Sequence, residues 1–145
     1  MRNAANILWF LAAFAFVCLP LPGSLPTANA ADLEADLEIV GDADAGERIF
    51  KICGGCHTID EGGRTKDGPN LYTVIGRTAG TLEGFRYSKA MKAAGASGIV
   101  WGRKTLNEYL NDTWKYVPGN IMGLSSIGDA TDRANVIAFI ERETR

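Results

Sequence analysis

The stretch that decides the fold is Cys53-Gly54-Gly55-Cys56-His57, in which two cysteines stand three residues apart and a histidine follows at once. Cysteines at positions i and i+3 of a helical turn point to the same side, so both thiols can bond to one edge of a flat cofactor. The adjacent imidazole is then held where a ring nitrogen can bind a central iron. The spacing predicts covalent attachment of one haem through Cys53 and Cys56, with His57 as an iron ligand.

Three other interpretations of this motif agree less well with the sequence. A thioredoxin-like redox pair needs a β-α-β pattern, and strand signals are scarce here. A zinc site needs about four Cys or His ligands, whereas only two Cys and one His remain if Cys18 leaves with an N-terminal signal segment. A structural disulfide would explain the cysteines but not the histidine beside them.

The first thirty residues have the features of a cleavable signal peptide. Arg2 gives a positive start, an apolar run covers residues 7–21, and Ala28-Asn29-Ala30 offers a small-x-small cleavage site. The run is shorter than the roughly 20 residues of a membrane span, although an uncleaved anchor is the alternative. We therefore expect export to the periplasm. The predicted divisions are a signal peptide at 1–30, an acidic N-terminal extension at 31–40 and one cofactor-binding domain at 41–145.

The charge of the chain excludes one class of partner. Without Arg2, 14 Lys and Arg face 17 Asp and Glu, a net charge of −3. Seven of the acids are clustered near the start of the exported chain: Asp32, Glu34, Asp36, Glu38, Asp42, Asp44 and Glu47. Nucleic acids favour basic surfaces, so no nucleic-acid partner is expected, and contact with a membrane is expected to be peripheral only.

Hydrophobic spacing predicts helices joined by long loops, and no sheet. We expect helices over about 44–52, 88–94, 105–112 and 131–142. Residues 58–86 are rich in glycine, which predicts an extended loop, and a loop of that length needs a bulky group to fill its interior. Residues 114–127 are predicted to be irregular because Pro118-Gly119 interrupts them. The prediction is an all-α fold, with about four to five helices and long loops around one covalently bound haem.

Few groups of the chain could be the second axial ligand of the iron. His57 is the only histidine of the chain, so the choice lies among Met, Lys, the terminal amine, water and no ligand. Met91 lies in a helical stretch, where packing in the core is the simpler role. Met122 follows the Pro118-Gly119 turn, in a loop that can fold over a flat ring. Position therefore favours Met122.

Several spaced motifs resemble the class I c-type cytochromes, the family of mitochondrial and bacterial cytochrome c. The resemblance covers about residues 41–142 and implies the class I cytochrome c fold for the domain at 41–145. The motifs that carry it are Gly46 with Ile49-Phe50, Cys53-x-x-Cys56-His57, Gly68-Pro69-Asn70-Leu71, Ile75-Gly76-Arg77, Trp101 and Tyr116-Val117-Pro118-Gly119-x-x-Met122.

The resemblance implies a role for individual side chains. His57 and Met122 would be the two iron ligands, the Pro69 carbonyl would accept a hydrogen bond from the His57 ring, and Tyr109 would donate one to the Met122 sulfur. For the aromatic residues, simple core packing is the alternative. The implied cofactor-binding set is Cys53, Cys56, His57, Pro69, Met122 and Tyr109, together with Arg77, Tyr87 and Trp101 beside the haem propionates.

The sequence also departs from that family at the rim of the expected haem site. Mitochondrial members carry a ring of lysines there, which Lys66 and Lys115 match. Other residues stand at the remaining ring positions, namely Ile52, Trp114, Ile121, Gly128 and Asp129.

Together, motif and resemblance predict a monomeric one-electron carrier rather than an enzyme. Its haem c iron would cycle between Fe(II) and Fe(III) in a respiratory, photosynthetic or dehydrogenase-linked chain. The implied partners are redox proteins: a membrane cytochrome complex, an oxidase, a reaction centre or a periplasmic dehydrogenase. The alternatives are a haem c subunit of an oxidoreductase complex, and a ligand-binding or peroxidase-like haem protein with an open sixth site.

Overall fold

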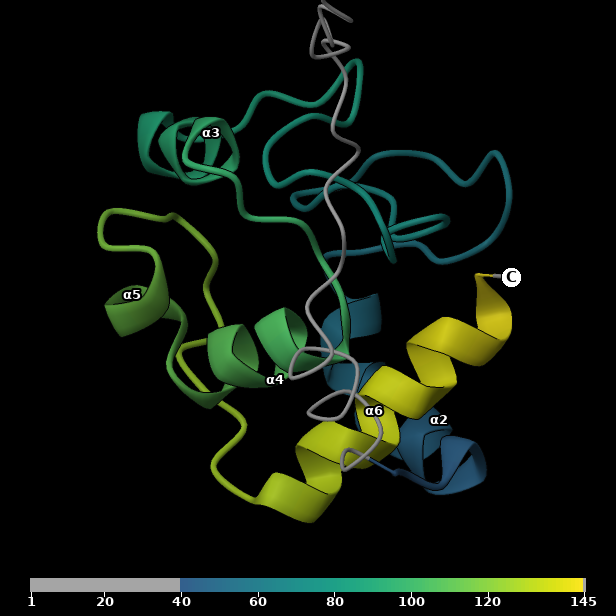
Figure 1. Cartoon of the computed structure of the whole chain (residues 1–145). Coiled ribbons are helices and arrows are strands. Elements are labelled where there is room, and N and C mark those ends of the chain that lie inside the picture. Colours follow the sequence, from purple (N-terminus) through teal and green to yellow (C-terminus); the bar gives the residue numbers. More distant parts are fainter. Residues whose placement is uncertain (1–39, 145) are drawn as a thin grey trace, which may run out of the picture.

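A computed structural model describes residues 40–144, and helices joined by long loops make up this part of the chain (Figure 1). The predicted signal peptide at 1–30 and residues 31–39 of the acidic extension lie outside the described residues. The only extended pairing in the described range is an isolated bridge between Thr78 and Val100. The all-α prediction is therefore confirmed. The helices are α2 (Ala43–Gly54), α3 (Lys89–Ala96), α4 (Arg103–Asn111), α5 (Thr113–Tyr116) and α6 (Ala130–Glu143).

Helix α2 is longer than the sequence predicted, and the extension matters for the site. Asp42 caps its start, since the carboxylate accepts hydrogen bonds from the backbone N–H groups of Asp44 and Ala45. At the other end, the helix continues to Gly54 and so includes Cys53. The first thiol of the motif is therefore held on a helical turn.

The prediction that residues 114–127 are irregular throughout is wrong at its start. One helical turn, α5, forms there because the Asp112 side chain accepts a hydrogen bond from the Lys115 N–H. Pro118 lies two residues beyond Tyr116, where a proline cannot continue a helix. A single turn of this kind is set by its cap and has no hydrophobic period long enough to read from sequence.

Helices α2 and α6 cross closely and form the base of the molecule (Figure 1). Gly46 lies at the crossing, where its missing side chain lets the Asn135 backbone approach. One turn later, the Phe50 ring lies 5.1 Å from that of Phe139, between ring centroids. On the exposed side, Arg142 forms an ion pair with Asp44. The first and last helices of the described chain are thus packed directly against each other.

We expect Gly46→Ala to destabilise this crossing, because the added Cβ would overlap the Asn135 carbonyl. Backbone atoms cannot rotate away, so the two helices would have to separate, which costs about 2 kcal/mol. Guanidinium unfolding of the mature protein measures the loss. The control is Gly54→Ala in the same helix, whose Cβ would lie 4.0 Å from the Phe50 ring, an ordinary contact. Equal stability of the two variants would show that the crossing tolerates a methyl group.

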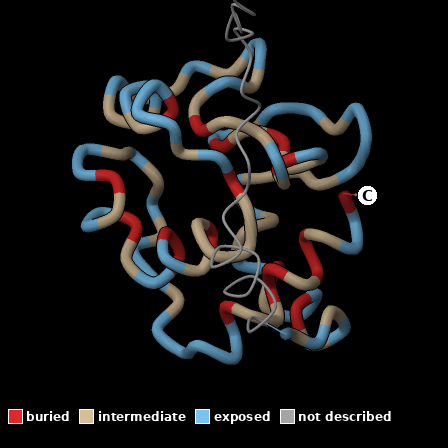
Figure 2. Tube along the Cα trace, viewed as in Figure 1, coloured by how far each residue is buried: buried red, intermediate tan, exposed pale blue. Residues whose placement is uncertain are grey.

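Helix α4 packs on α6 and completes the core beneath the loops. Leu106 and Leu110 of α4 are buried, as are Val136 and Ile137 of α6. Arg103 of α4 forms a two-pronged ion pair with Glu141 of α6, with N–O distances of 2.7 and 2.6 Å. Figure 2 shows that buried stretches alternate with exposed ones along the helices. Between residues 40 and 144, none of the helices combines the length and the apolar character that a membrane crossing requires.

The long segment 58–86 has no helix, and hydrogen bonds within the segment and to the rest of the chain hold it in place. The Leu71 N–H donates to the Thr58 carbonyl at 2.8 Å, and the Gly76 N–H donates to the Trp101 carbonyl at 2.7 Å. Residues 58–86 therefore form an extended loop, as their glycine content predicted.

Candidate functional site

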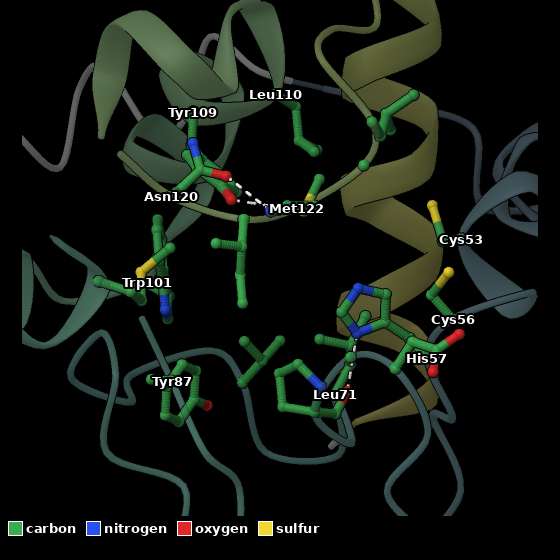
Figure 3. A pocket seen from close by; sticks show the side chains of 18 of the residues that line it. Cys53, Cys56, His57, Leu71, Tyr87, Trp101, Tyr109, Leu110, Asn120 and Met122 are labelled. Atoms are coloured by element: carbon green, nitrogen blue, oxygen red, sulfur yellow. Dashed lines mark hydrogen bonds between the residues drawn. The ribbon is translucent and has the colours of Figure 1, made fainter. Parts of the chain in front are cut away.

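A cavity of about 440 Å³ lies between the long loop, the helices and the segment after α5 (Figure 3). Much of its wall is aliphatic, with Leu71, Val74, Leu106, Leu110 and Ile140 among the lining side chains. The structure also brings all nine sequence-predicted site residues to this one cavity: Cys53, Cys56, His57, Pro69, Arg77, Tyr87, Trp101, Tyr109 and Met122.

The end of α2 places both thiols and the imidazole on the same side of the cavity (Figure 3). The backbone N–H groups of Cys56 and His57 both donate to the Cys53 carbonyl, at 3.0 and 2.9 Å. Neither cysteine forms a disulfide with another described residue. Burial raises the pKa of the Cys53 thiol, so this sulfur is held as a neutral thiol.

The His57 ring is fixed in one tautomer. Its Nδ1 lies 2.7 Å from the Pro69 carbonyl oxygen, which can only accept, so Nδ1 carries the hydrogen. Burial lowers the pKa of His57, and the nearby charge of Lys66 acts in the same direction, although the Pro69 bond opposes them. The imidazole is therefore neutral at neutral pH, and its Nε2 keeps a lone pair for a metal ion.

Asn70 holds the loop that carries Pro69, a role that was not predicted from the sequence. Its side-chain amide donates to Thr58 Oγ1 at 2.8 Å, and also reaches the carbonyls of Asp60 and Gly63. Its Oδ1 accepts from the Tyr72 N–H at 2.6 Å. The one sequence signal was an asparagine in a Gly-Pro-Asn turn, where such side chains often bond to nearby backbone.

Across the cavity from His57, Met122 is held by a tyrosine (Figure 3). The Tyr109 hydroxyl donates to Met122 Sδ at 3.3 Å. Burial raises the pKa of Tyr109 to about 12, so this hydroxyl stays protonated and can donate at neutral pH. The bond leaves the thioether facing the cavity.

A second asparagine that sequence reasoning missed fixes the loop around Met122. Asn120 Oδ1 accepts from the Met122 N–H at 2.9 Å, while its amide donates to the carbonyls of Thr113 and Val117, at 2.6 and 3.0 Å. Thr113 is fully buried, and its hydroxyl donates to the Leu124 carbonyl at 2.9 Å. The segment carrying Met122 is therefore tied down on both sides.

Arg77, Tyr87 and Trp101 form a polar patch in the cavity wall. The Arg77 guanidinium donates to the backbone carbonyls of Tyr72 and Asn70, at 3.3 and 3.0 Å. Burial lowers the pKa of Arg77 and raises that of Tyr87, and each of the two opposes the shift of the other. A guanidinium with an indole and a phenol beside it suits acidic groups on a ligand.

The other methionine of the described range lines the same cavity without the same support. Met91 belongs to α3, whose start is fixed when Ser88 Oγ accepts from the Met91 N–H at 3.1 Å. Its sulfur receives no hydrogen bond from any residue between 40 and 144, whereas the Met122 sulfur does. Of these two methionine sulfurs, the Met122 sulfur is therefore the one held by a hydrogen bond within the described chain.

The residues of the cavity fit a flat, largely apolar cofactor with a metal at its centre. Two thiols stand at one edge, a neutral imidazole and a thioether face the interior, and a guanidinium patch suits acidic substituents (Figure 3). The two axial donors alone would bind a free metal ion weakly, so the donor set suits a metal whose other ligands come with the cofactor.

Comparisons with known proteins agree with this chemistry. The sequence model of the family described as "Cytochrome c" matches residues 43–142. A cytochrome c of Chlamydomonas reinhardtii is 45% identical over 105 residues, which cover 72% of this chain and 91% of the relative. A cytochrome c2 of Agrobacterium tumefaciens is 44% identical over 100 residues, covering 69% and 90%. A cytochrome c2 of Afifella marina is 40% identical over 97 residues, covering 67% and 78%.

Proposed function

Because the chain belongs to the cytochrome c family, whose members are haem c electron carriers, we propose that His57 and Met122 hold the haem iron of this protein as its two axial ligands. One haem c is bound covalently through Cys53 and Cys56. When bound, the haem supplies an iron that cycles between Fe(II) and Fe(III). The protein is an electron-transfer protein and not an enzyme.

The observation that carries the proposal is the pairing of His57 with Met122 across one cavity (Figure 3). Each of the two has its free donor atom toward the interior and a second group that fixes its orientation, Pro69 for the imidazole and Tyr109 for the thioether. A ligand held in this way keeps its place when the charge of a bound metal changes, which suits rapid electron transfer. With both residues bound to the iron, no position would remain for oxygen or a substrate, which disfavours the peroxidase-like alternative.

The remaining cavity residues adjust the electrostatics of the site. The aliphatic wall excludes water and so disfavours the more highly charged state of the iron. The Arg77 guanidinium, with Tyr87 and Trp101, compensates the charge of acidic groups on the cofactor. These residues therefore favour the reduced state, in agreement with a neutral thioether ligand.

We further propose that the protein acts in the periplasm as a monomer. The relatives come from bacteria and from eukaryotes, so membership of the family does not indicate in which compartment the protein acts. The sequence pattern of residues 1–30 favours export. Its redox partners would be a membrane cytochrome complex, an oxidase, a reaction centre or a periplasmic dehydrogenase.

The test is to express the whole chain in a bacterium that matures c-type cytochromes and to recover the periplasmic protein. We expect a mass equal to residues 31–145 plus one haem, and a reversible one-electron couple in a spectroscopic redox titration. We also expect no shift of the reduced spectrum under carbon monoxide. A colourless protein would contradict haem attachment, and prompt carbon monoxide binding would contradict closed axial ligation.

A further inference from the structure

The segment that joins α5 to α6 carries Met122 and contains no helix (Figure 1). None of residues 123–128 is buried. This stretch begins and ends with Gly123 and Gly128, and an added Cβ at either position would meet nothing within 4 Å. A segment with so little packing of its own is held in place mainly by its hydrogen bonds. These bonds therefore decide how firmly the chain that follows Met122 is held.

The end of this segment that lies away from Met122 is tied to two helices. The Ile127 N–H donates to the Leu110 carbonyl of α4 at 2.7 Å. The carbonyls of Ile127 and Gly128 both accept from Arg133 Nη1 of α6, at 2.8 and 2.9 Å. Arg133 thus binds the last two residues of the segment with a single guanidinium nitrogen.

The surroundings of Arg133 show that these bonds are its main interactions. The residue is only 8% exposed, although arginine is among the residues least often buried. Its Nε donates to Asn107 Oδ1 of α4 at 2.9 Å, and it forms no ion pair with a carboxylate of residues 40–144. A buried charge is costly unless hydrogen-bond acceptors surround it. The guanidinium and its three oxygen partners are therefore held together as one unit.

We propose that Arg133 is a positioning residue for the Met122 ligand, because its guanidinium holds the 127–128 carbonyls and so keeps the segment after Met122 against α4 and α6. This role rests on the proposed function, in which the Met122 thioether binds the iron. The Met122 N–H is held by Asn120, so the thioether cannot move far unless its segment moves with it. Without the Arg133 anchor the segment opens more often, and an external ligand replaces the thioether sooner.

The test measures how fast cyanide replaces the thioether in the ferric, haem-loaded protein, followed by loss of the iron–sulfur absorption band. Arg133→Met removes all three hydrogen bonds. We expect replacement to become at least about tenfold faster, as for the loss of one hydrogen bond from a charged group. Arg133→Lys keeps the charge, but an ammonium lacks the planar fork of a guanidinium. This variant should therefore recover only part of the slow replacement.

Amide hydrogen exchange gives a second readout, which involves no added ligand. In the reduced protein, the Ile127 N–H should exchange at least about tenfold faster in Arg133→Met than in the wild type, because local opening of the segment exposes it. The N–H of Ile140, buried within α6, should change only as far as the global unfolding free energy changes. The two amides together separate local opening from a general loss of stability.

Two control variants leave the segment untouched. Gly46→Ala destabilises the crossing of α2 and α6, and Arg142→Met removes an exposed guanidinium of α6 whose ion pairs are with Asp44, Glu47 and Glu143. Neither should speed cyanide replacement or the exchange of the 127 amide.

The inference is overturned if Gly46→Ala speeds cyanide replacement as much as Arg133→Met does, because the effect would then be one of general stability. It is also overturned if Arg133→Met stays within about twofold of the wild-type rate, the scatter expected of an uncoupled site. Should Arg133→Met not fold, a wild-type rate in Arg133→Lys overturns it instead. A wild type without the iron–sulfur band would refute Met122 ligation itself, so failure of the proposed function is recognised before any variant is compared.

Discussion

Met122→Ala is expected to abolish the red-edge absorption band of the ferric iron–sulfur bond and to lower the midpoint potential by about 0.3 V. The size follows from the roughly 0.8 V range over which axial ligands move haem potentials. A neutral thioether favours ferrous iron, and its loss lets water take the position. The variant should also bind carbon monoxide promptly in the reduced state. Absorption spectroscopy and a redox titration measure all three effects.

The chain offers a matched control, since Met91 lines the same cavity. Met91→Ala removes the same side-chain volume, but the Met91 sulfur is not the one to which Tyr109 donates a hydrogen bond. The absorption band and the midpoint potential should therefore stay close to the wild-type values. If Met122→Ala keeps the band and Met91→Ala loses it, Met91 and not Met122 is the iron ligand. If neither variant loses the band, another group occupies the sixth position of the iron.

Much of the site could be predicted because its chemistry lies in short, contiguous motifs. Cys53, Cys56 and His57 stand within one pentapeptide, and a lone histidine leaves few choices for the second ligand. The helices at both ends of the domain were predicted from apolar residues at helical spacing. Such local sequence patterns predict the structure well where the tertiary contacts favour the same secondary structure as the local sequence does.

The features that sequence reasoning missed depend on where backbone groups meet. Asn70 and Asn120 organise the two loops that carry Pro69 and Met122, yet their partners are carbonyls and N–H groups that any sequence supplies. The hydrogen bond from the Trp114 indole to the Met122 carbonyl was equally hidden, because its acceptor is again a backbone group that any sequence supplies.

Gly68→Ala is expected to cause the largest loss of stability of any single methyl group added to the site. The new Cβ would overlap the His57 ring, lying 2.7 Å from both Nδ1 and Nε2 and closer still to Cε1. The backbone cannot withdraw, since the Gly68 N–H donates to the Cys56 carbonyl at 2.8 Å and its own carbonyl accepts from Lys66 N–H at 3.2 Å. The ring must therefore turn, which breaks its bond to Pro69.

We expect this variant to lose more than about 3 kcal/mol of unfolding free energy, the upper end of the range for overpacking, with Tm falling by more than about 10 °C. Guanidinium and thermal unfolding of the haem-loaded protein measure both values. Gly55→Ala, in the pentapeptide that contains His57, is the control, because its Cβ would meet only the Ile52 carbonyl, at 3.8 Å, and its φ of −58° suits alanine. If Gly68→Ala unfolds like Gly55→Ala, the His57 ring has room to move, and the fixed imidazole on which the proposed ligation depends is refuted.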